Sequence, residues 1–194
     1  MRCFVAIYPD IRLLAQLRDL RHQLRKQLPD AEIRWIQEDT LHLTLAFCAE
    51  IEDEQAERVW NILQPRLARQ SPFDIRLTEI GPFPARRPLV VALGLERPPA
   101  LQTLDLTIQA ALEEVGLPRS TRPLEPHITL ARVRGKANPR SRRLLQGLDR
   151  LPLRGSLHVK EIRMVQSHLT ATGAQHTPLH VIPLGGNSVD KTTA

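Results

Sequence analysis

The sequence contains one five-residue pattern twice, as "HLTLA" at 42–46 and as "HITLA" at 127–131. In a β-strand the side chains alternate between two faces, so the histidine and threonine of each copy point to one side and the apolar residues between them to the other. Each copy therefore predicts a strand that rests on a hydrophobic core with one face and presents an imidazole and a hydroxyl on the other.

The two copies are surrounded by similar sets of elements. Short apolar or alternating runs predict strands at 2–8, 32–36, 40–47, 73–80, 88–95, 126–133, 156–167 and 176–184. Apolar residues three and four positions apart predict helices at 11–28, 52–69, 99–115 and 138–148. Each half thus has four strands and two helices, and each of the two histidines, 85 residues apart, follows the first helix of its half.

This order predicts an α+β fold of two pseudo-symmetric lobes, each an antiparallel sheet with helices on its outer face, with an active-site cleft between them. We expect one bilobal domain over 1–184, with duplicated halves at about 1–80 and 86–184. The polar, glycine-rich stretch 185–194 predicts a flexible tail. If a twofold axis relates the lobes, the polar faces of the two histidine strands meet in the cleft.

The charge of the chain favours nucleic acid as a partner. The formal net charge is +6, and 23 of the 27 basic residues are arginines, whose planar guanidinium binds two phosphate oxygens at once. An arginine-rich solvated surface is the alternative. The apolar content of 42% in 194 residues is enough for a hydrophobic core.

The remaining features predict a cytoplasmic monomer. The apolar runs are too short to cross a membrane, and "CFVAIY" near the start lacks the features of a secretion signal. Cys3 and Cys48 lie in apolar strands, which predicts buried free thiols in a reducing compartment. A cleft between two lobes of one chain needs no second subunit, and we expect no membrane partner.

Two imidazoles and two hydroxyls around one point suit the cleavage of a phosphodiester. A neutral imidazole can take a proton from the nucleophile while a protonated one gives a proton to the leaving oxygen, and a pKa near 6.5 allows both forms near neutral pH. The hydroxyls can donate to the non-bridging oxygens. Two alternatives are histidines that merely pack in the core and a zinc site, which needs three or four ligands and usually shows a characteristic ligand spacing that this sequence lacks.

At these residues the sequence resembles the two-histidine phosphoesterase superfamily, and within it the RNA 2′,3′-cyclic phosphodiesterases first named 2′-5′ RNA ligases. The similarity includes "RCFVAI", "RWIQEDTLHLTLAF", "GPFPARRPLVVALGL", "RPLEPHITLAR" and "VQSHLTATGAQHTPL". The resemblance implies metal-independent hydrolysis of RNA 2′,3′-cyclic phosphate ends to 2′-phosphates, with no cofactor, and it allows reversible 2′-5′ ligation. The implied partner is an RNA, such as a tRNA-like fragment, with a 2′,3′-cyclic phosphate end.

The resemblance also implies a role for particular residues. His42 and His127 are the expected catalytic pair, with His42 as the proton donor to the departing 3′-oxygen and His127 as the proton acceptor that activates water. Thr44 and Thr129 are expected to bind the phosphate. Because the two motifs are nearly identical, the direction of proton transfer stays open at this point.

The flanks of the motifs are where the two copies differ. Arg132 is expected to contact phosphate, and Phe47 either stacks on a base or fills the core. The chain departs from the family pattern at Cys48 and Ala49, where leucine and glycine are usual, and at His176, where tyrosine is common. These departures concern substrate preference rather than the core chemistry.

The basic run after the second motif is expected to contact the phosphate backbone at the mouth of the cleft. It comprises Arg132, Arg134, Lys136, Arg140, Arg142 and Arg143. Two other functions stay open: a phosphodiesterase that acts on small cyclic nucleotides, and an RNA-binding module without catalysis.

Overall fold

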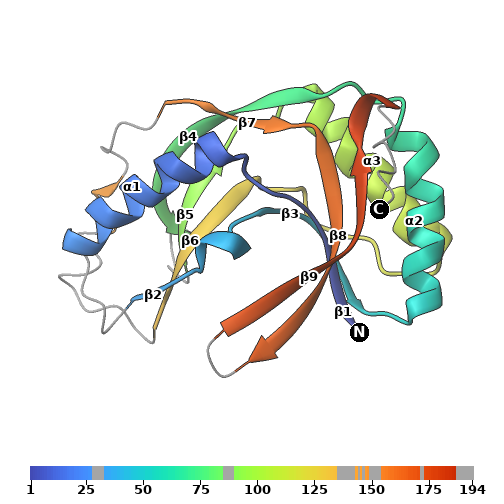
Figure 1. The fold of residues 1–194 in the computed structure, drawn as a ribbon, viewed down its shortest axis with the longest axis horizontal. Helices are drawn as coiled ribbons and strands as arrows, with labels where there is room; N and C mark the ends of the chain where they lie inside the picture. Colours follow the sequence, from blue (N-terminus) through green and yellow to red (C-terminus); the bar gives the residue numbers. More distant parts are fainter. Residues whose placement is uncertain are drawn as a thin grey trace, which may run out of the picture.

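A curled antiparallel sheet of nine strands forms the centre of the molecule, with helices on its outer side (Figure 1). The computed structural model describes residues 1–27, 33–84, 90–134, 154–170 and 173–186, together with 143, 145, 147 and 148. The expected α+β class is confirmed.

The sheet has two wings that meet in its middle. One wing contains β3, β1, β8 and β9 in that order, and the other contains β7, β4, β5 and β6, with β2 paired to β6. The bounds are β1 (Arg2–Ile7), β2 (Ile33–Trp35), β3 (Leu43–Glu50), β4 (Phe73–Phe83), β5 (Val90–Leu95), β6 (His127–Val133), β7 (Ser156–Val159), β8 (Glu161–Thr170) and β9 (Gly173–Pro183). The wings join where Leu43 of β3 pairs with Ile128 of β6.

The three described helices agree with the predicted ranges and begin and end at residues suited to those places. They are α1 (Ile11–Gln27), α2 (Asp53–Leu67) and α3 (Pro99–Glu114). Asp10 caps α1, because its Oδ1 accepts a hydrogen bond of 2.8 Å from the backbone N–H of Leu13. Glu52 opens α2 with a capping box, and α3 is followed by Gly116 at a φ of 77°.

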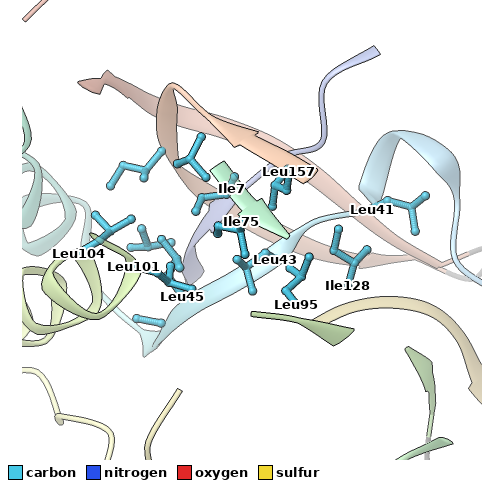
Figure 2. Packing of buried hydrophobic residues seen from close by; sticks show 14 of the residues in the cluster. Ile7, Leu41, Leu43, Leu45, Ile75, Leu95, Leu101, Leu104, Ile128 and Leu157 are labelled. Carbon is cyan, nitrogen blue, oxygen red and sulfur yellow. The ribbon is translucent and has the colours of Figure 1, made fainter. Parts of the chain in front are cut away.

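The helices pack on the outer side of the two wings. α2 and α3 pack against each other beside the wing that contains β3, and α1 lies over the wing that contains β4, β5 and β6 (Figure 1). Buried leucines and isoleucines of both wings and all three helices form one continuous core. Figure 2 shows Leu43 and Ile128 within it, both at most 1% exposed. A shared core of this kind fixes the wings relative to each other.

The strand predicted at 156–167 is two strands in the structure. The chain bends at Lys160, because β7 pairs with β4 in one wing and β8 pairs with β1 in the other. The buried positions change phase across the bend, from Leu157 and Val159 to Ile162 and Met164. This change of phase in the alternation is the sequence signal of the crossing between wings.

The strands of each wing come from distant parts of the chain. The wing of β1 and β3 is completed by β8 and β9 from the C-terminal part, so both wings mix strands of the expected halves 1–80 and 86–184. The internal duplication stays a prediction. Most of the expected helix 138–148 and the tail beyond 186 lie outside the described residues, and Gly185 belongs to a short 3₁₀ turn, Leu184–Gly186.

The two cysteines are buried and free, as expected. Burial raises the pKa of the Cys48 thiol to about 12, which keeps it protonated and unreactive at neutral pH. None of the described helices is long and apolar enough to span a bilayer.

Candidate active site

The two repeated motifs line a single cleft of about 810 Å³. All six side chains predicted for the site face this space: His42, Thr44, Phe47, His127, Thr129 and Arg132. The structure thus brings together residues that are far apart in the sequence, and their individual roles stay predictions.

The pairing of β3 with β6 sets the relative positions of the two motifs. In an antiparallel pair, the residues on either side of a facing pair also face each other. Since Leu43 faces Ile128, the register places His42 beside Thr129 and Thr44 beside His127. Each imidazole therefore has the hydroxyl of the other motif as its neighbour across the pair of Leu43 and Ile128.

Both imidazoles are held in the same way. Nδ1 of His42 lies 2.7 Å from the carbonyl oxygen of Thr40, and Nδ1 of His127 lies 2.8 Å from that of Glu125. A carbonyl oxygen can only accept, so each Nδ1 carries a hydrogen and donates it. In the neutral ring Nε2 is then the basic nitrogen, and in the charged ring Nε2 carries the proton that can be transferred.

The loop before β3 is fixed by a buried arginine of α1. Arg21 is 7% exposed, and its guanidinium donates to the carbonyl oxygen of Ile36 and lies 3.5 Å from the carboxylate of Glu38. Glu38 opens the short 3₁₀ turn Glu38–Thr40. This turn presents the carbonyl that orients His42, so α1 contributes to the placement of the imidazole.

Each histidine also packs against a phenylalanine, which the sequence reading did not identify. The ring of His42 stacks on Phe4 with 4.8 Å between centroids, and the ring of His127 stacks on Phe83 at 4.3 Å. Phe4 faces away from the main core because β1 is buried on both faces: Cys3, Val5 and Ile7 belong to that core, whereas Phe4 packs in a second cluster. The continuous apolar run in "RCFVAIY" is the pattern of a strand that is buried on both faces.

The electrostatic environment makes His42 a neutral imidazole in the unliganded cleft. Burial, together with the nearby His176, His127 and Arg132, lowers the pKa of His42 to about 4, although its hydrogen bond to Thr40 acts in the opposite direction. At pH 7 the Nε2 of His42 therefore lacks a proton in the free protein. A bound anion stabilises the imidazolium and raises this pKa.

A third imidazole lies next to His42. The centroids of His176 and His42 are 5.1 Å apart, and the hydroxyl of Tyr8 lies 3.0 Å from Nδ1 of His176. Burial raises the pKa of Tyr8 to about 12, so its hydroxyl is protonated and can donate to Nδ1. Burial also lowers the pKa of His176. The departure from the family pattern at His176 therefore lies within the cleft itself.

A β-bulge in each motif strand explains why Phe47 and Arg132 reach the cleft. Strict alternation after Thr44 and Thr129 would turn the next alanine toward the cleft and bury these two side chains. The pairings Ala6 with Thr44 and Val5 with Ala46 omit Leu45, and the pairings Ala92 with Thr129 and Val91 with Ala131 omit Leu130. The repeated "LA" therefore contains an extra residue that shifts the alternation by one position.

The bulges place an aromatic side chain at one end of the cleft and a basic side chain at the other. From the facing pair Leu43 and Ile128, β3 and β6 run in opposite directions, so Phe47 and Arg132 lie on opposite sides of it. Phe47 is 74% exposed, which suits stacking on a base rather than filling the core. The two copies are thus alike at histidine and threonine and differ at the position that follows the bulge.

The cleft is positively charged. Arg2, Arg34 and Arg132 line it, and no aspartate or glutamate does so among the described lining residues. Of the predicted basic run, Arg134 and Arg143 are exposed, and Lys136, Arg140 and Arg142 lie outside the described residues. Within the described part of the chain, no group of three or more histidines, cysteines or carboxylates is arranged to hold a metal ion.

Comparison with known proteins finds relatives that match most of the chain. The family model of the 2′-5′ RNA ligase superfamily matches residues 9–171. The chain is 28% identical over 186 residues to an RNA 2′,3′-cyclic phosphodiesterase of Methanothermobacter thermautotrophicus, with 95% of this chain and 99% of that protein covered. It is 31% identical over 193 residues to an RNA 2′,3′-cyclic phosphodiesterase of Thermus thermophilus, with 96% and 91% covered.

The fold is shared with solved structures. The crystal structure of Escherichia coli LigT with 3′-AMP superimposes with a TM-score of 0.75 at 29% identity, over 94% of this chain and 97% of that one. The match of the family model over most of the chain, together with these relatives, shows that the chain belongs to the 2′-5′ RNA ligase superfamily.

Proposed function

We propose that the protein hydrolyses 2′,3′-cyclic phosphate ends of RNA to 2′-phosphates by general acid–base catalysis with His42 and His127. The observation that carries the proposal is the matched presentation of the two imidazoles. Each donates its Nδ1 hydrogen to a backbone carbonyl two residues earlier, which leaves both Nε2 atoms for proton transfer in one cleft. The names of the relatives support the substrate class.

The proposed reaction has one displacement at phosphorus. Nε2 of His127 takes a proton from water as the water oxygen bonds to phosphorus. The bond between phosphorus and the 3′-oxygen breaks, and Nε2 of His42 gives its proton to that oxygen. The products are a 2′-phosphate and a free 3′-hydroxyl, so one water molecule is consumed. The hydroxyls of Thr44 and Thr129 donate to the non-bridging oxygens, where negative charge is concentrated.

Because the pKa of His42 is low, His42 can donate a proton only if the bound substrate raises that pKa. In the free cleft His42 is neutral at pH 7, because burial lowers its pKa to about 4. The phosphate anion of the substrate raises this pKa, so His42 takes up a proton when the substrate binds. Nε2 then holds a proton beside the leaving oxygen, while Nδ1 continues to donate to Thr40.

The same geometry suits 2′-5′ ligation as a second activity, which the name of the matching family favours. A 5′-hydroxyl of another RNA replaces water as the nucleophile, gives its proton to His127 and forms a 2′-5′ phosphodiester. The 3′-oxygen leaves with the proton of His42 as before. The site lies within one chain, so neither activity requires a second subunit.

Hydrolysis in the presence of EDTA tests the proposal. We expect the protein to convert an oligonucleotide with a 2′,3′-cyclic phosphate end to the 2′-phosphate with undiminished rate in EDTA. His42→Ala and His127→Ala should each lower kcat by about 10²–10⁴-fold, the range for loss of a general acid or base. The double variant should be little slower than either single variant, since the pair works as a unit.

His22→Ala is the matched control, since His22 is an exposed histidine of α1 outside the cleft, and it should hydrolyse at the rate of the unmodified protein. Absence of hydrolysis would contradict the proposal and favour an RNA-binding module. Turnover of small cyclic nucleotides alone would identify the other enzyme class. Strictly additive losses in the double variant would contradict a coupled pair.

A substrate with sulfur in place of the 3′-oxygen tests the direction of proton transfer. A thiolate leaves without protonation far more readily than an alkoxide, so the loss of the general acid matters less. We expect the sulfur substrate to restore the activity of His42→Ala by about tenfold or more relative to the oxygen substrate and to leave His127→Ala slow. Restoration of His127→Ala instead would reverse the assignment.

Titration of His42 by NMR tests the proposed proton uptake. In the free protein the His42 imidazole should titrate near pH 4, because burial lowers its pKa. Saturating inorganic phosphate should raise this pKa, and by linkage phosphate should bind more tightly as the pH falls toward 4. A His42 pKa near 6.5 in the free protein, or one that phosphate leaves unchanged, would contradict this account.

A further inference from the structure

We infer that Arg34 and Arg132 form a binding site for a second phosphate group, the phosphodiester directly 5′ of the terminal nucleotide. The inference rests on the proposed function and extends it, because such a site selects an RNA chain over a mononucleotide with the same cyclic end. These two arginines make up the upstream phosphate site.

The pairing of β2 with β6 brings the two guanidinium groups together. Arg34 and Arg132 face each other across the two antiparallel strands, and both side chains are exposed and line the cleft. Side chains in facing positions have Cβ atoms about 4.5–5.5 Å apart, close enough for both arginines to reach one phosphate.

The upstream phosphate site lies beside the reacting phosphate rather than at it. Along β6, the order from the centre of the cleft outward is His127, Thr129 and Arg132, and β2 pairs with β6 beside Arg132. Because Leu130 is an extra residue, Thr129 and Arg132 are two partner positions apart, which corresponds to about 7 Å. Both arginines thus lie beyond Thr129 along β6, Arg132 on that strand and Arg34 opposite it on β2.

The surroundings of the site suit a nucleic acid strand. Trp35, which follows Arg34 on β2, packs against the core on the other side of the strand, with the guanidinium of Arg25 5.4 Å from its ring centroid. Arg34 is therefore on the face of β2 that is turned to the cleft. Among the described lining residues no carboxylate opposes the positive charge. The wall of β2 and β6 thus offers a path for the RNA chain away from the reacting end.

The side chain at the opposite end of the cleft determines the direction in which a bound RNA lies. Phe47 lies on the other side of the facing pair Leu43 and Ile128. If the terminal base stacks on Phe47, the chain upstream of that nucleotide passes the catalytic pair and leaves along the wall that carries Arg34. The asymmetry between Phe47 and Arg132 then determines which way an RNA end enters an otherwise symmetric cleft.

Three substrates test the upstream phosphate site. They are a nucleoside 2′,3′-cyclic phosphate, a dinucleotide with the same cyclic end, and that dinucleotide with a neutral methylphosphonate in place of its internal phosphodiester. For the unmodified protein we expect kcat/KM for the charged dinucleotide to exceed that for the other two by about tenfold or more, the size of one charge-assisted hydrogen bond. Arg34→Ala should reduce this preference about tenfold, and Arg34→Lys should retain part of it.

Arg76→Ala is the matched control. Arg76 is an exposed arginine on β4 that does not line the cleft, and its guanidinium pairs with Glu96 at 3.1 Å. This variant loses the same charge and should keep both the activity and the preference. Equal hydrolysis of the charged and neutral dinucleotides by the unmodified protein would overturn the inference. An Arg34→Ala variant that loses the same factor on all three substrates would also overturn it, since that loss is structural.

A binding measurement tests the upstream phosphate site independently of the proposed function. If the unmodified protein cleaves none of the three substrates, the proposed function is wrong, and affinity decides the inference alone. The probe is a fluorescent dinucleotide 2′-phosphate titrated at several salt concentrations. Loss of one phosphate contact in Arg34→Ala should reduce the slope of log affinity against log salt by about 0.7. An unchanged slope would overturn the upstream phosphate site, and Arg76→Ala should keep the slope of the unmodified protein.

Discussion

Leu43 and Ile128 face each other at the place where β3 meets β6, and the geometry of the cleft depends on this contact. It connects two wings whose strands otherwise pair within themselves. The two side chains belong to the core shared by both wings and all three helices, so the contact is held from the side opposite the cleft. The polar residues on either side of the pair, His42 with Thr129 and Thr44 with His127, are consequently held as one set.

The two motifs are alike in the residues that they contribute to the site, and they differ in the residues that surround them. The symmetric part is the histidine and threonine of each motif, together with the carbonyl that orients each ring and the phenylalanine beneath it. Such a set can accept one proton and donate another, but symmetry alone does not decide which ring does which. The surroundings of the two rings differ: burial lowers the pKa of His42 to about 4, and His176 lies beside His42 with 5.1 Å between the ring centroids.

Much of the fold followed from the sequence, because periodicity reports burial directly. The expected strands and helices that lie within the described residues are present, and the recurrence of the motif predicted a common cleft. The alternation rule failed at Leu45 and Leu130, since a bulge adds a residue that only the pairing partner reveals. The resemblance to the family pointed to Phe47 and Arg132 at positions where strict alternation would have buried them.

Other parts of the site were not predictable from local pattern. Phe83 and Tyr8 reach the histidines through tertiary packing between segments far apart in the chain. The pKa of His42 depends on how deeply the ring is buried, which periodicity does not specify. The break at Lys160 was readable from the change of phase, but its cause is the crossing of the chain from one wing to the other.

The most direct test of the account is a crystal structure of the protein with a nucleoside 2′-phosphate, the product of the proposed reaction. The account predicts that the phosphate lies between the two motifs, with Nε2 of His42 and His127 and Oγ1 of Thr44 and Thr129 each within about 3.2 Å of an oxygen of the product. A phosphate that contacts the histidine and threonine of one motif alone, with the other imidazole beyond hydrogen-bonding distance, would contradict the claim that the two copies form one active site.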